Sequence, residues 1–463
     1  MKLTRYLFLL LLLSFAFPCH LSASAEEIKV VEDLNLLHWM RANVSPVTKV
    51  PFSFEILGDK KSVFQKIVRR SSITGIIERM IVDEGMSVYD AALWQIALTS
   101  TENLNDRENA MRLVDYYWNG SLGEFDHIRT GSGRQIFVYD PEHPDVVTSD
   151  LTQEGRRGFI FRILNANGQY LSSDPLDGKT AYAGFPNNPM IHWEDWKPIA
   201  GENAWVVMAA LHLFVSDHSR LAGTSNEFKL AEELARAAMF LQAQNGGIRM
   251  APIGTYYHLQ DIAPTLSDEE IAHQLDIRAK TVDGDNAEVP KETIKVGRLE
   301  YPPYHLWHYD EISIENNISW YAAFRMLDRL TGKPEYRQAM GRIEECLKSS
   351  WDPKRKIFYQ GAHYTDGQWK PNKDPFAVDV QNLAIIVFGP KTIDSWFGEG
   401  ASHEIWRSLK SLAGVFKIDG SLKGFGLRVK KTGYPLNGQR VQFLPRGYWL
   451  IIISRAIRIG LQR

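Results

Sequence analysis

The chain has 463 residues, of which 44% are hydrophobic, 23% charged and 11% aromatic, and this composition excludes a disordered or low-complexity protein. With 53 Lys and Arg against 55 Asp and Glu, the formal net charge of −2 excludes the strongly basic character of a typical nucleic-acid-binding protein. A prior of about 150 residues per domain would divide the chain into three, although large single-domain architectures depart from that prior.

The first 25 residues have the three parts of a signal peptide. Lys2 and Arg5 supply positive charge, an apolar run follows over residues 7–17, and Ala23-Ser24-Ala25 has the small-residue pattern of a cleavage site. The apolar run is shorter than the roughly 20 residues that a membrane span needs. We therefore expect export to the periplasm or the medium, a mature chain of residues 26–463, and no membrane span.

The two cysteines fit this interpretation. Cys19 could carry a lipid anchor, but Phe17-Pro18 before it lacks the small residues usual at such sites, so a lipoprotein is the less favoured form. Cleavage would leave Cys346 alone, and the mature chain would then have no internal disulfide. Because Cys346 lies in an amphipathic helical pattern, we expect a buried, unreactive thiol.

Four segments along the chain share one form, a short entry with an acid or Asn followed by a compact helix of Ala and bulky apolar residues. They are residues 87–98, 201–211, 314–324 and 376–387. Such helices are apolar nearly all round, which indicates burial on every side.

More amphipathic helices follow the first three of these segments. They are predicted over residues 106–118, 226–244 and 335–349, and a last buried helix is predicted near residues 448–459. Alternating buried and amphipathic helices predict an inner and an outer layer, the arrangement of an all-α (α/α) toroid. We expect a single toroid domain over residues 26–463.

Two long irregular stretches interrupt the helices. Residues 122–198 are rich in Gly, Pro, Asp and Asn and contain β-like runs at 135–139 and 158–164, whereas residues 251–310 include a polar, charged insertion. Loops of this length in a compact domain are usually functional or disordered. We expect both to be insertions into the toroid that carry minor β-structure.

The four buried helices each have an acid at or near their start: Asp90, Glu202, Glu315 and Asp379. In a toroid the inner helices begin at one rim, so these carboxylates would meet there. A pair of carboxylates is what glycosidic bond cleavage needs, one to protonate the leaving oxygen and one to act as base or nucleophile. The alternative is structural, because acids near a helix start also accept hydrogen bonds from free N–H groups and favour the helix dipole.

Aromatic and charged residues cluster shortly before two of these acids. Trp193, Glu194, Asp195 and Trp196 precede Glu202, and Trp307, His308 and Tyr309 precede Glu315. Such clusters suit a poly- or oligosaccharide, because flat rings stack on sugar faces while polar groups bind hydroxyls. They could instead attach the two long loops to the core, and Trp205 and Trp320 are expected to be core residues.

Other chemistries find little support in the sequence. No G-x-S-x-G, P-loop or dinucleotide-binding glycine motif is present. The His305-Leu-Trp-His308 pair is too weak a pattern for a metal site, and residues 283–288 lack the glycine and distant glutamate of a calcium loop. We expect no metal and no cofactor.

The four helical segments, including Glu315-Asn-Asn-Ile-Ser-Trp-Tyr-Ala-Ala-Phe and Asp379-Val-Gln-Asn-Leu-Ala, resemble the six-hairpin glycosidase-like superfamily from Ser87 onward. The resemblance implies an (α/α)6 toroid that acts on poly- or oligosaccharides. It does not extend to one family's acid–base pair, so it assigns no catalytic role to any residue. Polysaccharide lyases and sugar epimerases also resemble this architecture.

The leading hypothesis is an exported, monomeric glycoside hydrolase with Glu202 as its first essential carboxylate, Asp90 as its second, and Glu315 and Asp379 as further candidates. Neighbouring tryptophans would raise the pKa of Glu202 toward that of a general acid. One alternative is a non-catalytic glycan-binding or envelope-assembly protein. Another is a lyase or epimerase that uses His308 and Tyr309.

Overall fold

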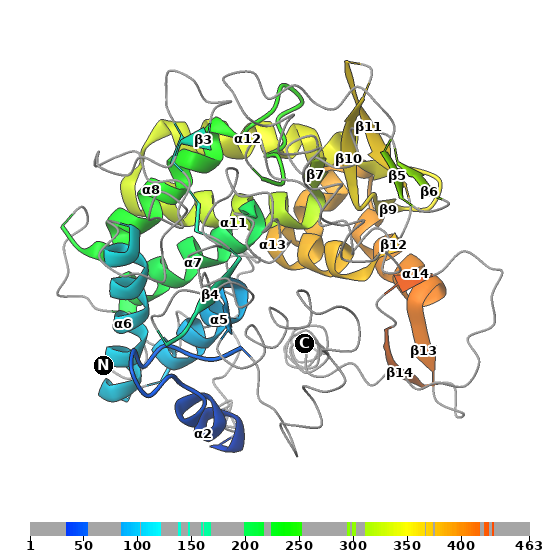
Figure 1. The fold of residues 1–463 in the computed structure, drawn as a ribbon. Coiled ribbons are helices and arrows are strands. Elements are labelled where there is room, and N and C mark those ends of the chain that lie inside the picture. The colour runs from blue at the N-terminus through cyan, green and yellow to red at the C-terminus, as the bar shows by residue number, and fades with distance from the viewer. Residues whose placement is uncertain are drawn as a thin grey trace. The chain divides into compact units, whose positions relative to one another are not determined.

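A computed structural model describes residues 34–53, 85–101, 103–121, 138–139, 147–148, 159–160, 162–167, 199–216, 224–251, 294–296, 299–301, 311–365, 367–373, 376–416, 421–425 and 428–429. The chain divides into a compact unit of residues 1–428 and a second of residues 429–463, of which only Val429 is described. Figure 1 labels helices and strands of the first unit.

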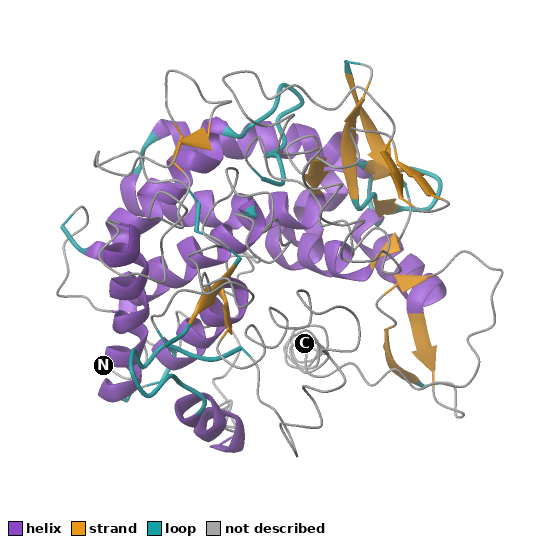
Figure 2. Cartoon of the chain, in the orientation of Figure 1, coloured by secondary structure: helices purple, strands orange, loops and turns teal. Residues whose placement is uncertain are grey.

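Most of the described chain is helical (Figure 2). After the short helix α2 (Leu34–Ala42), eight helices form four consecutive hairpins in the described part of the chain. The pairs are α5 (Val88–Thr99) with α6 (Leu104–Ser121), α7 (Ala200–Ser216) with α8 (Asn226–Phe240), α11 (Ile314–Thr331) with α12 (Pro334–Ser349), and α13 (Val378–Phe397) with α14 (Ala401–Ala413).

The hairpins build two layers. The first helices of the pairs contact one another in the order α5, α7, α11, α13, and each is covered by its own second helix. Burial follows this division, since 13 of the 17 residues of α7 are buried but only five of the 16 residues of α12. An inner helix is thus apolar on all sides, whereas an outer helix is apolar only on the side that packs against the inner layer.

Side-chain amides at equivalent positions fasten three inner helices to extended segments. The fourth residue of α7, α11 and α13 is Asn203, Asn317 or Gln381, and each bonds both the N–H and the C=O of one residue, which is Ile160, Ile248 or Phe358 respectively. In α11 the Ile248 N–H donates to Asn317 Oδ1 at 2.7 Å and Asn317 Nδ2 donates to Ile248 O at 3.0 Å. Each amide also bonds the carbonyl just before its own helix. We call these three side chains the amide clamps.

Two residues after the residue that is bonded by an amide clamp, each extended segment also contacts the preceding inner helix. The first N–H of α5, of α7 and of α11 donates to a backbone carbonyl there, in the pairs Val88 N–Arg162 O (2.9 Å), Ala200 N–Met250 O (2.8 Å) and Ile314 N–Gln360 O (3.0 Å). Every segment therefore joins the first turns of two neighbouring inner helices. The four inner helices must all begin at one end of the layer.

Two tryptophans of the inner helices also donate hydrogen bonds to backbone carbonyls. Trp94 and Trp320 are each the seventh residue of their helix, and their indole N–H groups donate to Met40 O at 2.8 Å and Ala200 O at 2.9 Å. Trp320 is fully buried, which confirms its prediction as a core residue, whereas Trp205 keeps part of its surface exposed.

Short strands lie among the helices. β1 (Gly85–Ser87) pairs antiparallel with β4 (Ile163–Asn165), and β11 (Gln368–Asn372), β10 (Gly361–Thr365) and β7 (Glu311–Ser313) form an antiparallel sheet in that order. The other pairs are β2 (Val138–Tyr139) with β3 (Val147–Thr148), β5 (Ile294–Val296) with β6 (Leu299–Tyr301), β8 (Trp351–Asp352) with β9 (Ile357–Phe358), and β13 (Gly414–Phe416) with β14 (Leu422–Phe425). The strands β12 (Phe376–Ala377) and β15 (Arg428–Val429) complete the set. Because β1, β7 and β12 run directly into α5, α11 and α13, they fix where these helices begin.

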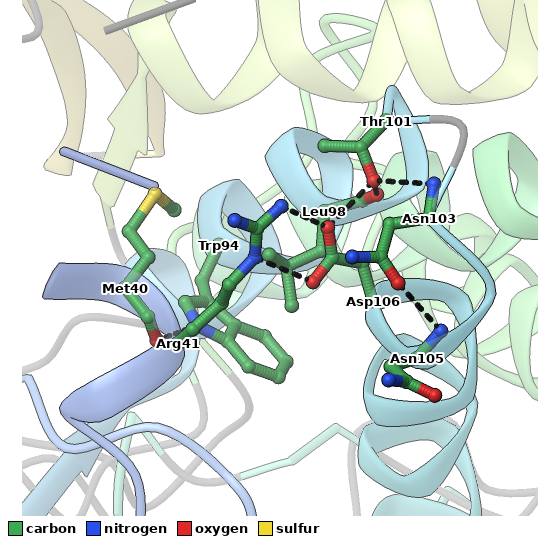
Figure 3. Close-up of polar contacts among 8 residues, drawn as sticks. All are labelled: Met40, Arg41, Trp94, Leu98, Thr101, Asn103, Asn105 and Asp106. Carbon is green, nitrogen blue, oxygen red and sulfur yellow. Dashed lines mark hydrogen bonds and ion pairs between the residues drawn. The ribbon is translucent and has the colours of Figure 1, made fainter. Parts of the chain in front are cut away.

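The helix α2 is attached to the first hairpin by a network of polar contacts (Figure 3). Arg41 donates from Nε and Nη2 to the two carboxylate oxygens of Asp106, at 2.8 and 2.7 Å. Thr101 donates to the same carboxylate at 2.7 Å. Although burial raises its pKa, these hydrogen bonds and the guanidinium charge bring the pKa of Asp106 below its usual 3.8.

The structure confirms the seven helices predicted in its described part. The fourth inner helix, α13, begins at Val378 within the predicted segment 376–387, continues beyond it to Phe397, and contains a break at Gly389, where φ is +75° and Pro390 follows. Sequence patterns did not assign α2, α14 or the β10–β11 hairpin. The thiol of Cys346 is 1% exposed, as predicted, and burial raises its pKa to about 12.

Several predictions fall outside the described residues. These are the signal peptide, the helix near 448–459 and most of the two insertions, of which only β2 to β6 and short flanking pieces are described. The complete (α/α)6 toroid needs two hairpins more than the described residues contain, so it stays a prediction, as does the single domain over residues 26–463.

Candidate functional site

The four acids predicted at the rim lie in the first turns of the four inner helices. Asp90 and Glu202 are the third residues of α5 and α7, and Glu315 and Asp379 are the second residues of α11 and α13. Since these helices begin at one end of the layer, the four carboxylates belong to one region of the fold. We call these four residues the rim set.

Helix capping explains one of the four directly. Val380 N–H donates to Asp379 Oδ1 at 3.0 Å, and Ala377 before α13 has no side chain that could cap the helix. Asp379 therefore satisfies a free N–H group of its own first turn, which is the structural alternative considered for all four acids.

Capping explains Asp90 and Glu315 less well, because serines already serve these helix starts. Ser87 Oγ accepts from Asp90 N at 3.5 Å, and Ser313 Oγ accepts from Asn316 N at 3.3 Å. A serine thus already provides the N-cap acceptor at each of these two helix starts.

Glu202 has a different partner. Its Oε1 lies 3.0 Å from Arg162 Nε, and the two side chains are 15% and 24% exposed. A guanidinium so close, partly shielded from water, favours the ionised carboxylate. The sequence suggested a protonated Glu202 among tryptophans; this ion pair supports the charged form.

Glu202 also lies between the first turns of two other inner helices. On one side, Tyr89 of α5 contacts Trp205 of α7 edge to face, with ring centroids 5.3 Å apart. On the other side, Gly201 packs so closely on α11 that a Cβ atom there would come within 2.0 Å of Asn316 Oδ1. The neighbours of Glu202 along the chain thus touch the neighbours of Asp90 and of Glu315.

Asn316 adds an available donor at this place. Its Nδ2 is buried and has no hydrogen-bond partner among the described residues. An unsatisfied buried donor costs about 1–3 kcal/mol, so such groups are found where a ligand or a water completes them.

The sequence did not single out Arg162, Tyr89 or Asn316. Arg162 lies in the β-like run that was predicted at 158–164, but its ion pair joins residues 40 positions apart, which no local pattern reveals. Asn316 belongs to the motif that resembles the superfamily, but the sequence predicted no role for its side chain.

The aromatic and charged residues predicted to bind substrate lie outside the described residues. They are Trp193, Glu194, Asp195, Trp196, Trp307, His308 and Tyr309. Across the described ranges, no three His, Cys, Asp or Glu side chains group so as to hold a metal ion. No helix in those ranges is long and apolar enough to cross a membrane.

No protein-family model and no curated protein matches the sequence. Solved structures with similar folds include an α-mannanase of glycoside hydrolase family 76 from Bacteroides thetaiotaomicron, with 9% identity, a TM-score of 0.37 and coverage of 77% of this chain and 72% of that one. An α-1,6-mannanase of Salegentibacter sp. HEL1_6, in complex with α-1,6-mannotriose, shares 13% identity over 48% of each chain at a TM-score of 0.27. A cellobiose 2-epimerase from Bacillus thermoamylovorans shares 12% identity over 75% of this chain and 84% of that one, also at 0.27.

The chain spans 36% to 48% of the length of the first structures that it matches. At TM-scores below 0.5 these similarities carry no argument about this chain.

Proposed function

We propose that the protein is an exported glycan-active enzyme, a glycoside hydrolase whose reacting carboxylates belong to the rim set. One observation carries the proposal: the extended segments tie the first turns of four inner helices to one end of the layer, and each of these turns contains a carboxylate. The partly exposed Tyr89–Trp205 side of this region offers ring surface next to the acids, as sugar binding requires.

The ion pair with Arg162 assigns Glu202 its role in the proposal. A carboxylate that is held ionised acts as base or nucleophile, so the proton must come from another acid of the rim set. Asp90, on the neighbouring helix α5, is our proton donor, and Glu315 on α11 is the next candidate. Asp379 is the weakest candidate because its carboxylate caps its own helix.

The reaction follows from these roles. Asp90 gives its proton to the glycosidic oxygen as the C1–O bond breaks. Glu202 either removes a proton from the water that attacks C1, or bonds to C1 itself and is later displaced by a water whose proton passes to the now ionised Asp90. The separation of the two carboxylates decides between the inverting and the retaining course.

A screen with three matched variants tests the proposal. The full chain is incubated with neutral and acidic glycans, including α-1,6-mannan, and reducing ends are counted. Glu202→Gln and Asp90→Asn should each lower the rate by about 10²–10⁴-fold, whereas Glu108→Gln, on the outer helix α6 where that side chain is 62% exposed, should leave the rate unchanged.

Other outcomes decide against the hydrolase. Products with an ultraviolet-absorbing double bond would indicate a lyase, and a changed sugar without bond cleavage would indicate an epimerase. Glycan binding without turnover would indicate the non-catalytic glycan-binding protein. Turnover that survives both rim substitutions would contradict the assignment of the site.

A further inference from the structure

Positive charge is concentrated on two neighbouring hairpins outside the rim set. Residues 351–373 contain five Lys or Arg but only two acids, in a chain whose formal net charge is −2. One of these acids, Asp352, is used internally, since Arg355 Nε donates to its Oδ2 at 2.6 Å and two backbone N–H groups bond its Oδ1. Asp352 is thus engaged by Arg355 and by the backbone rather than by the side chains of Lys354 and Lys356.

The cations come from both hairpins and meet at one ring. Arg355, in the turn between β8 and β9, donates to Lys373 O just after β11, at 3.1 Å. The Arg355 guanidinium carbon and Lys373 Nζ lie 5.7 and 6.0 Å from the centroid of Tyr359. Lys354, Lys356 and Lys373 are exposed, so the fold presents a cluster of like charges to the solvent.

The backbone at Lys356 gives a second, independent indication. Its φ is +56°, and in the described part of the chain only Lys49 and Lys356 are non-glycine residues with positive φ. This conformation suits glycine and is unfavourable for a lysine. Because glycine would fit this turn without strain, the exposed side chain of Lys356 is a candidate for binding a ligand.

Aromatic rings continue the surface along the β10–β11 hairpin. Trp369 pairs directly across the hairpin with Tyr364, with ring centroids 5.3 Å apart, and the Arg249 guanidinium lies 5.1 Å from Trp369. Trp369 lies in β11 and Lys373 directly follows this strand, four residues on and about 13 Å away along an extended chain. Both Trp369 and Tyr364 are partly exposed.

We propose that this surface, formed by Arg249, Lys354, Arg355, Lys356, Trp369 and Lys373 and called here the hairpin strip, binds an acidic polysaccharide. The cations pair with carboxylate or sulfate groups, and the partly exposed rings pack on the sugars between them. This goes beyond the proposed hydrolase, because binding to the strip requires no turnover at the rim set.

Titration calorimetry on the full chain tests the strip with polygalacturonate, dextran sulfate and neutral dextran. The proposal expects binding to the acidic polymers and none to dextran, with affinity falling as salt rises; comparison of the first two polymers shows whether carboxylate or sulfate is preferred. Lys354→Ala, Lys356→Ala and Lys373→Ala together should weaken binding about tenfold. Trp369→Ala should weaken it without changing the salt dependence.

Two further variants separate the strip from general charge and from folding. The triple variant Arg112→Ala, Arg337→Ala and Lys348→Ala removes the same charge from outer helices and should bind normally. Lys356→Gly should raise the melting temperature, because glycine accepts the positive φ, and yet weaken binding. Equal weakening by both triple variants, normal binding by Lys356→Gly, or equal affinity for DNA or for vesicles of anionic lipid would overturn the proposal.

Discussion

Arg162 links two inner helices through different atoms: its Nε lies 3.0 Å from Glu202 Oε1 of α7, and its carbonyl accepts the first N–H of α5 from Val88 at 2.9 Å. The same residue thus pairs with one candidate catalytic acid and positions the helix that carries another, Asp90. The two effects can be separated, because the backbone contact does not depend on the side chain.

Arg162→Met should therefore keep the fold and lose function. The backbone bond to Val88 stays, while Glu202 loses the cation that favours its ionised form. We expect kcat/KM to fall by about 10²-fold or more and the free energy of unfolding to fall by only about 1–2 kcal/mol, since the pair is not fully buried. Steady-state kinetics and urea unfolding measure both. Arg112→Met, which breaks an exposed pair with Glu108, is the control and should change neither; equal kinetics in the two variants would contradict the role of Arg162.

Asn316 is expected to bind substrate through its unsatisfied Nδ2. Asn316→Ala should raise KM more than it lowers kcat, and Asn316→Asp should not restore binding because it removes the donor. Gly201→Ala should also raise KM, although it leaves the Asn316 amide in place. The added Cβ would lie 2.0 Å from Asn316 Oδ1 and displace that side chain. Unchanged KM in Asn316→Ala and Gly201→Ala would show that this contact serves packing alone.

The amide clamps are expected to matter for stability rather than for turnover. Asn317→Ala would leave the N–H and C=O of Ile248, which is fully buried, without partners. Each unsatisfied group costs about 1–3 kcal/mol, so we expect a loss of about 3 kcal/mol in the free energy of unfolding. Chemical denaturation followed by circular dichroism measures it. Asn105→Ala, at an exposed position of α6, should cost less than about 0.5 kcal/mol. If Asn317→Ala were as stable as Asn105→Ala, the amide clamps would not be a source of the protein's stability.

The junction of α2 with the first hairpin should make stability depend on pH. The pKa of Asp106 is lowered in the folded state, so its contribution is complete above the usual value of 3.8 and is lost as the pH falls through the lowered value. Asp106→Asn should accordingly destabilise the protein at pH 7, and the difference from the wild type should shrink progressively below about pH 4. Urea midpoints between pH 7 and pH 2.5 test this. A difference that stays constant over that range would mean that the charge of Asp106 is not what stabilises the junction.

Much of the helical arrangement could be predicted because the inner helices have a local signature. A run such as Trp205 to Leu211 is apolar on every side, and that pattern alone distinguishes an inner from an outer helix. The starts of α5 and α11 were also predictable, since Ser87 and Ser313 are suitable N-caps.

What the sequence could not show depends on contacts between distant residues. The clamp of Asn203 on Ile160 spans 43 positions and that of Asn317 on Ile248 spans 69, so neither leaves a local pattern. The Arg162–Glu202 pair is missed for the same reason, and with it the charge state of Glu202. The β10–β11 hairpin was missed because Pro371 interrupts its strand pattern.

The central claim is that Glu202 is the base or nucleophile of a glycoside hydrolase, and chemical rescue tests it most directly. On the best substrate from the glycan screen, Glu202→Ala should lose nearly all activity. Because the shortened side chain leaves room for a small anion, added azide should restore turnover and yield a glycosyl azide of inverted anomeric configuration, since azide would attack C1 from the face that Glu202 occupies. Wild-type activity in Glu202→Ala without azide would contradict the claim.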